Sequence, residues 1–158
     1  MKIQPDNMKN ALIAAIREQF GKSGGAKAVI PISSDRLSNL RAALCTEALG
    51  TGRVLGVLTP NGSQRDMPDN YQLMEHLQIP GMIINIAGAV ESLHRQLAES
   101  GIKPTPQMDQ QLLPGIRMAV VDAVAQATNG QTVHFREHLS QQAMTELGHA
   151  LGLPENLM

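Results

Sequence analysis

Short apolar segments alternate with amphipathic helical patterns along this chain, and this alternation restricts the fold more than any other feature. Four apolar runs have the length of strands: KAVIPI (27–32), RVLGVL (53–58), MIINI (82–86) and QTVHF (131–135). Strands that alternate with helices form parallel sheets whose faces are covered by those helices. The sequence therefore predicts an α/β fold, a doubly wound parallel sheet of about four strands with helices on both faces.

The helices are predicted from apolar side chains that recur every three or four residues. Such stripes lie in residues 8–20, 37–48, 73–77, 90–97, 116–127 and 139–151. Residues 101–115 contain three prolines, so this segment is predicted to be a connector with a short helical turn.

The composition is that of one folded domain, predicted to span residues 1–158. The chain is 42% hydrophobic and 17% charged, values of a globular protein. A formal net charge of −1 gives no electrostatic reason to expect nucleic acid or an anionic membrane as partner. No apolar run approaches the length of a membrane span, and the first residues lack the apolar stretch of a signal peptide. A cytoplasmic protein is expected.

One pair of histidines has a spacing that occurs in metal sites. His134 and His138 are four residues apart with Glu137 between them, and on one helix this spacing can hold a metal ion. One histidine is expected to end a strand and the other to precede a helix, so we predict ordinary histidines and no metal site. The lone Cys45 is predicted to be a buried thiol in the second helix.

The junction after the first predicted strand is where a parallel sheet binds ligands. A phosphate-binding junction usually contains glycines, but the turn here is Ser33-Ser34-Asp35-Arg36. Ser34 or Asp35 is predicted to cap the following helix. The alternative is an altered anion or nucleotide site that uses Ser33, Ser38 and the helix N–H groups.

Several segments resemble the ammonia-dependent NAD synthetases, members of the N-type ATP pyrophosphatases. The resemblance is carried by these segments, which together cover nearly the whole chain: IPIS, AALCTEALG, LGVLTP with its Pro60, INIAGAVESL, GIRMAVVDAVAQATNG and LSQQAMTELGHALGLPENL. It implies the strand order 3-2-1-4 and a homodimer. The helix after Pro114 is apolar on more than one side, so Met118, Val121 and Val124 are expected either in a dimer interface or against the sheet of one subunit.

The departures from the family lie where its chemistry is expected. The family carries S-G-G-x-D-S after the first strand, where the glycines enclose the pyrophosphate of ATP and the aspartate helps to hold magnesium. Aligned with it, Ser33 and Ser38 match the two serines, Ser34 and Asp35 replace both glycines, and Leu37 replaces the aspartate. These five residues are interpreted as the remnant of a pyrophosphate site.

A second departure follows the fourth predicted strand. The family has a G-T-x-N-x-x-E stretch and a long active-site loop there, whereas VHFREHLSQQ leads to the last helix within a few residues. We therefore expect a catalytically inactive NAD synthetase-like protein that needs no cofactor and acts through protein contacts, as a homodimer or with an unknown partner.

Two alternatives stay open. One is a nucleotide or small-ligand binder whose modified pocket includes Ser33, Ser38 and Pro60. The other is a divergent active enzyme that performs the ATP-dependent amidation of nicotinate adenine dinucleotide.

Overall fold

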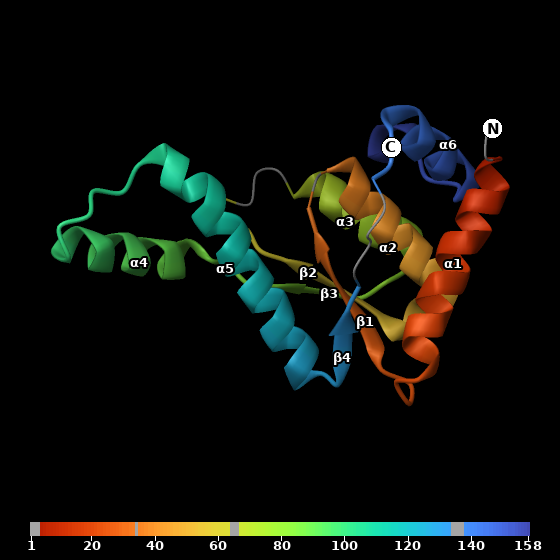
Figure 1. The fold of residues 1–158 in the computed structure, drawn as a ribbon, viewed down its shortest axis with the longest axis horizontal. Coiled ribbons are helices and arrows are strands. Elements are labelled where there is room, and N and C mark those ends of the chain that lie inside the picture. The colour runs from red at the N-terminus through yellow and green to blue at the C-terminus, as the bar shows by residue number, and fades with distance from the viewer. Residues whose placement is uncertain (1–3, 34, 64–66, 134–137) are drawn as a thin grey trace.

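A parallel sheet forms the centre of the molecule in the computed structural model, which describes residues 4–33, 35–63, 67–133 and 138–158. In these residues the strand order is β3-β2-β1-β4. The strands are β1 (Lys27–Ile32), β2 (Val54–Leu58), β3 (Gly81–Ile83) and β4 (Gly130–Thr132). All neighbouring strands are parallel, as Figure 1 shows. The predicted fold class and strand order are confirmed.

Six α-helices connect and cover the strands in the described residues. They are α1 (Pro5–Gly21), α2 (Arg36–Leu49), α3 (Pro68–Leu77), α4 (Ala87–Glu99), α5 (Pro106–Ala127) and α6 (Gln141–Ala150). Two short 3-10 turns, Thr51–Arg53 and Glu155–Leu157, complete the regular structure.

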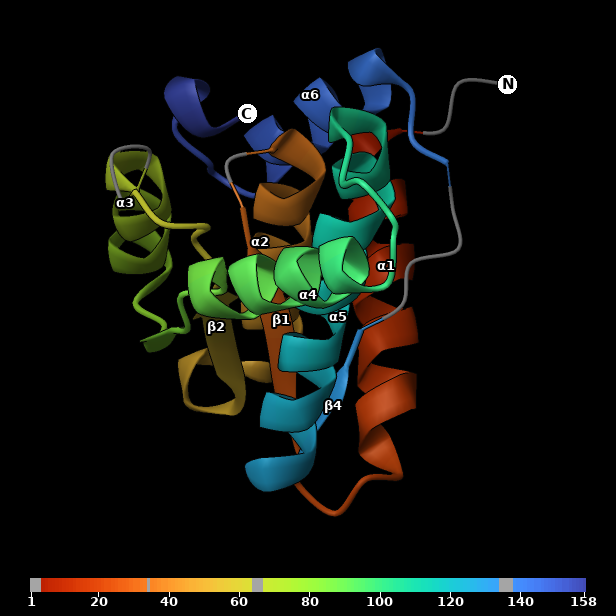
Figure 2. The same ribbon diagram turned by 90° about the vertical axis from the view of Figure 1, so that its left-hand side faces the viewer.

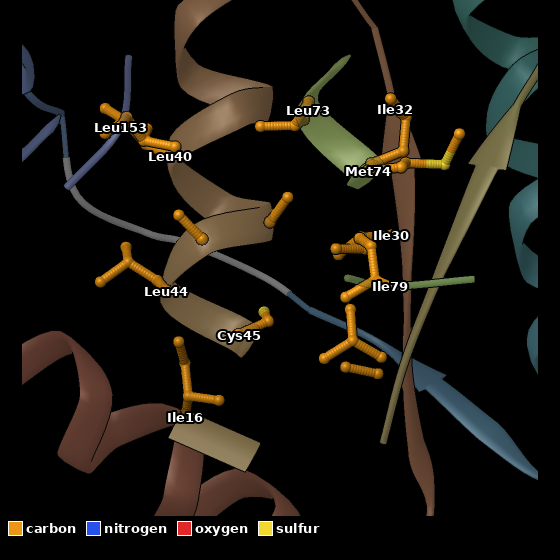
Figure 3. Close-up of a cluster of buried hydrophobic side chains, with 14 of the residues drawn as sticks. Ile16, Ile30, Ile32, Leu40, Leu44, Cys45, Leu73, Met74, Ile79 and Leu153 are labelled. Atoms are coloured by element: carbon orange, nitrogen blue, oxygen red, sulfur yellow. The ribbon is translucent and has the colours of Figure 1, made fainter. Parts of the chain in front are cut away.

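The larger core lies on the face of the sheet covered by α1, α2, α3 and α6. β1 sends alternate side chains to this face, among them Ile30 and Ile32, which lie beside Ile79 and Met74 (Figure 3). Leu40 and Leu44 belong to the same cluster and extend from α2 on its other side, toward Leu153 and Ile16. Cys45 is buried in the same cluster, as predicted. Burial of apolar side chains of this size contributes about 1.5–3 kcal/mol each, so this face carries most of the stability.

In the part of the chain that the structure describes, α5 packs on the opposite face of the sheet. Val121, Val124 and Ala125 of α5 contact Val29 of β1 and Val57 of β2. Figure 1 shows α5 running along this side of the sheet while α1 and α2 lie on the other. Helices therefore occupy both faces, as predicted.

The connector predicted for residues 101–115 is wrong. α5 begins at Pro106, so it includes most of the proline-containing segment. Thr105 caps it, because its side chain accepts a hydrogen bond from the N–H of Met108 at 3.3 Å. Proline is well tolerated in the first turn, where its missing N–H has no helical partner. Pro114 lies inside the helix, which continues past it.

The outer strands are shorter than the sequence predicts. β3 ends at Ile83, although MIINI continues to Ile86, and β4 ends at Thr132. Beyond β3, the N–H of Ile84 still donates to Leu58 O at 2.8 Å and that of Ile86 to Pro60 O at 2.8 Å. The chain thus follows β2 without forming regular strand, because it must turn into α4.

α4 stands away from the rest of the fold in Figure 1. In Figure 2, which is turned by 90°, it crosses in front of β1 and β2. All of its residues are described, and only Val90 among them is buried. His94 Nε2 lies 2.6 Å from Asp109 Oδ1 and connects α4 to the first turns of α5.

Candidate functional site

An open cleft of about 700 Å³ lies outside the carboxyl ends of β1 and β2. Its size is that of pockets that hold small molecules. One wall is formed by residues that end the two strands, and α5 contributes another. The lining residues include Pro31, Ser33, Asp35, Leu58, Thr59, Pro60, Asn61, Met67, Pro114, Arg117, Met118 and Val121.

Asp35 is the N-cap of α2 and lines the cleft just beyond the end of β1. Its Oδ1 accepts a hydrogen bond from the N–H of Ser38 at 2.8 Å, and its Oδ2 accepts one from the hydroxyl of Ser33. A carboxylate here also interacts favourably with the positive end of the helix dipole. The predicted cap is confirmed for Asp35, whereas Ser34 lies outside the described residues. The carboxylate takes the place where a helix N-terminus would receive an external anion.

Ser38 joins the start of α2 to the end of β1. Its hydroxyl donates to Pro31 O at 2.9 Å and accepts from the N–H of Ser33 at 3.2 Å. The residue is only 6% exposed and is not part of the cleft lining. The polar groups of Ser33 and Ser38 that an anion would need are thus already bound within the chain.

The side chains of two arginines near the cleft are held by hydrogen bonds within the chain. Arg36 follows Asp35, but its Nη1 donates to Gln141 Oε1 of α6 at 2.9 Å, and Arg36 does not line the cleft. Arg117 does line it, and its Nε donates to Thr59 O at 3.3 Å, which connects α5 to the end of β2. Asp35 and Arg117 are the charged side chains of the lining in the described part of the chain.

The structure brings together only some of the residues singled out from the sequence. Ser33, Asp35 and Pro60 line the cleft. Leu37 is half-buried in the first turn of α2 and does not line it. His138 is exposed, while His134 and Glu137 lie outside the described residues.

Met118, Val121 and Val124, all expected in a dimer interface or against the sheet, lie in two different environments. Val121 is 1% exposed and Val124 is also buried, both against β1 and β2 of the same chain, so for them packing within the chain is observed. Val121 also reaches the floor of the cleft. Met118 is 43% exposed and stays available to a partner.

Sequence reasoning did not assign Met67, Pro114 or Arg117 to the site. Arg117 lies four residues before Val121, so helical spacing places both on the same side of α5. That spacing was the available signal for Arg117, once α5 was known to cover the sheet. Nothing in the sequence around Met67 indicates a cleft.

Two kinds of feature are absent from the residues that the structure describes. No three side chains of His, Cys, Asp or Glu gather there in a way that would hold a metal ion. No helix in the same part of the chain has both the length and the apolar character needed to cross a membrane.

Comparison with known proteins gives consistent matches. The NAD synthase family matches residues 8–156. The glutamine-dependent NAD(+) synthetase of Thermotoga maritima is 35% identical over 94 residues, 58% of this chain and 16% of that protein. The NH(3)-dependent NAD(+) synthetase of Methanosarcina mazei is 34% identical over 98 residues, 60% of this chain and 38% of that protein. The chain thus spans well under half the length of these relatives.

A solved structure shows the same fold. The glutamine-dependent NAD+ synthetase of Acinetobacter baumannii in complex with adenosine diphosphate superposes with a TM-score of 0.85 at 16% sequence identity. The superposition covers 99% of this chain and 36% of that one.

Proposed function

Because the chain belongs to the NAD synthase family, we propose that it is a catalytically inactive member that acts through protein contacts. The observation that carries this proposal is the carboxylate of Asp35, which caps α2 inside the cleft. In the family that the sequence resembles, the corresponding turn encloses pyrophosphate with glycine N–H groups. Here a negative charge is held at that turn by Ser38 N–H and Ser33 Oγ.

The expected loss of catalysis follows from the charge that develops during adenylation. Forming an acyl adenylate and releasing pyrophosphate requires donors and a metal ion that stabilise the phosphates. Each such group is worth about 3 kcal/mol, so losing two slows the reaction on the order of 10⁴-fold. A fixed carboxylate at the same place adds repulsion. Leu37, which aligns with the family's aspartate, offers no oxygen ligand to magnesium.

The test is a pyrophosphate-release assay with ATP, magnesium, ammonia and nicotinate adenine dinucleotide. We expect no release above background. The combined variant Ser34→Gly, Asp35→Gly, Leu37→Asp is also expected to be inactive, because the segment between β4 and α6 lacks the family's long loop. Release by the unmodified protein that is abolished by Ser33→Ala and Ser38→Ala would show a divergent active enzyme instead.

Met118 supports the protein contacts in this proposal, since it is a large apolar side chain left exposed on a helix whose other apolar side faces the sheet. A second copy of the chain is the proposed partner.

A second candidate function is supported by the cleft itself. A cleft of about 700 Å³ remains open at the site, although the pyrophosphate turn has changed. The Acinetobacter relative of the same fold was solved with adenosine diphosphate. The second candidate is therefore a small-ligand binder without turnover.

A further inference from the structure

We propose that Asp35 determines the ligand specificity of the cleft and selects an uncharged nucleoside over its phosphorylated forms. This inference rests on the second candidate function, ligand binding without turnover, and specifies its ligand class.

The first step of the argument is the balance of charge in the cleft. Asp35 contributes a negative charge at the β1 end, and both of its oxygens are fixed by Ser38 and Ser33. Arg117 is the cation of the described lining, and its Nε is bound to Thr59 O at the β2 end. Arg36, the cation next to Asp35 in sequence, is turned to Gln141 of α6. Among the described residues of the lining, the β1 end therefore repels a phosphate and has no cation that compensates for the charge of Asp35.

The second step is the set of donors that a phosphate would use. Ser38 N–H donates to Asp35, and Ser33 N–H donates to Ser38 Oγ. Capture of a phosphate would have to break these bonds and displace the carboxylate. An unfavourable charge built against one ligand class is a common way in which a site discriminates between related molecules.

The third step concerns what the cleft can accept. Pro31, Leu58, Pro60 and Met67 give it an apolar lining suited to a flat ring, and Asn61 supplies an amide that can donate and accept. Its volume of about 700 Å³ is ample for a nucleoside. The Asp35 carboxylate can also accept a hydrogen bond from the 5′-hydroxyl of a nucleoside, whereas in ADP and ATP this oxygen carries the phosphate and has no proton to donate.

The test is titration calorimetry of the full chain with adenosine, ADP and ATP at 150 mM salt, without and with magnesium. We expect adenosine to bind, and ATP to bind at least about tenfold more weakly. Asp35→Asn keeps a good capping side chain but removes the charge. It should bring the dissociation constants of adenosine and ATP to within about threefold of each other. Asp35→Ser, which also caps a helix, serves as the second uncharged variant.

Two matched controls locate the effect. Asp6→Asn removes an acidic side chain in the first turn of α1, outside the cleft lining, and should leave the ratio of the adenosine and ATP dissociation constants unchanged. Met118→Trp enlarges a side chain in the exposed wall of the cleft and should weaken the binding of adenosine at least about tenfold. Tyr71→Trp changes a side chain that is equally exposed, 43%, but outside the lining, and should not weaken it.

The proposal is overturned if ATP binds as tightly as adenosine, or if adenosine does not bind. It is also overturned if neither Asp35→Asn nor Asp35→Ser brings the dissociation constants of adenosine and ATP closer together. These outcomes are separate from the pyrophosphate assay. A protein that releases no pyrophosphate and binds no adenosine refutes this inference alone, whereas pyrophosphate release refutes the proposed inactivity.

Discussion

Asp35 has a structural role that can be measured apart from any ligand. Asp35→Ala removes the acceptor for Ser38 N–H, so we expect the free energy of unfolding to fall by about 1 kcal/mol. Asp35→Asn should cost only a few tenths, because asparagine caps almost equally well. Urea denaturation of the three proteins measures the difference. Equal stability of the alanine variant and the wild type would contradict the described cap.

The thiol of Cys45 should be unreactive toward alkylating reagents in the folded protein. Burial raises the pKa of its thiol from 9.0 to about 12, an effect that Arg41 only partly offsets. At pH 8 about one folded molecule in ten thousand then carries the reactive thiolate. We expect iodoacetamide to label the protein in urea but not in buffer, as read by mass spectrometry. Rapid labelling of the folded chain would contradict this burial.

The same shift fixes the direction of a pH effect. The folded state holds the thiol proton more tightly than the unfolded state, so this stabilising contribution is present in full below pH 9. It is lost as the pH rises from about 9 toward 12.

Single residues also show where prediction from sequence succeeds. The cap at Asp35 could be predicted because a capping interaction is local, between residues three apart in the chain. The contact between Arg117 and Thr59 could not, because it joins residues 58 positions apart through the packing of α5 on the sheet.

At the scale of elements, α5 is where sequence reasoning failed most clearly. The prolines of this segment predict a connector, yet Thr105 caps the helix and Pro106 fits its first turn. Pro114 is tolerated in the interior because Val121, Val124 and Ala125 bury the following turns against the sheet. Tertiary packing thus outweighed local propensity. The central strands were predicted well because β1 and β2 are buried on both faces. The end of β3 was not, because the apolar residues of MIINI continue beyond it, and β4 consists of Gly-Gln-Thr, which has no apolar side chain.

Pro114→Ala should therefore stabilise the protein. An interior proline removes a helical hydrogen bond and costs about 3 kcal/mol relative to alanine, while it restricts the unfolded chain by up to about 1 kcal/mol. We expect a net gain of about 2 kcal/mol in urea denaturation. Pro106→Ala is the matched control and should bring no gain, because Pro106 lies in the first turn. A loss of stability in Pro114→Ala would mean that the proline is required by the packing of α5.

At the scale of the whole molecule, the proposed second copy can be tested at Met118. If the exposed side of α5 forms a dimer interface, Met118→Glu should shift the mass measured by light scattering from dimer to monomer at micromolar concentration. Burying an unpaired carboxylate in an interface is costly. Tyr71→Glu, at an equally exposed position on α3, should leave the mass unchanged. A wild-type protein that is monomeric at 100 μM would contradict the dimer.

The whole fold was easier to predict than the site for a physical reason. Alternating apolar runs determine the sheet and its covering helices, and these runs are long and repeated. The cleft depends on the relative positions of Pro31 in β1, Pro60 just after β2 and Pro114 in α5, which come from three separate parts of the chain.

The isolation of α4 has a consequence for the time scale of motion. A helix that buries only Val90 and is joined to its neighbour through His94 and Asp109 can unfold locally while the sheet stays intact. Its backbone amides should exchange with deuterium orders of magnitude faster than those of β1, whose exchange requires opening of the core. Exchange followed by mass spectrometry would show two classes of protection, with α4 in the fast class and β1 in the slow one. The molecule would then consist of a slowly opening sheet that carries a helix in constant local exchange.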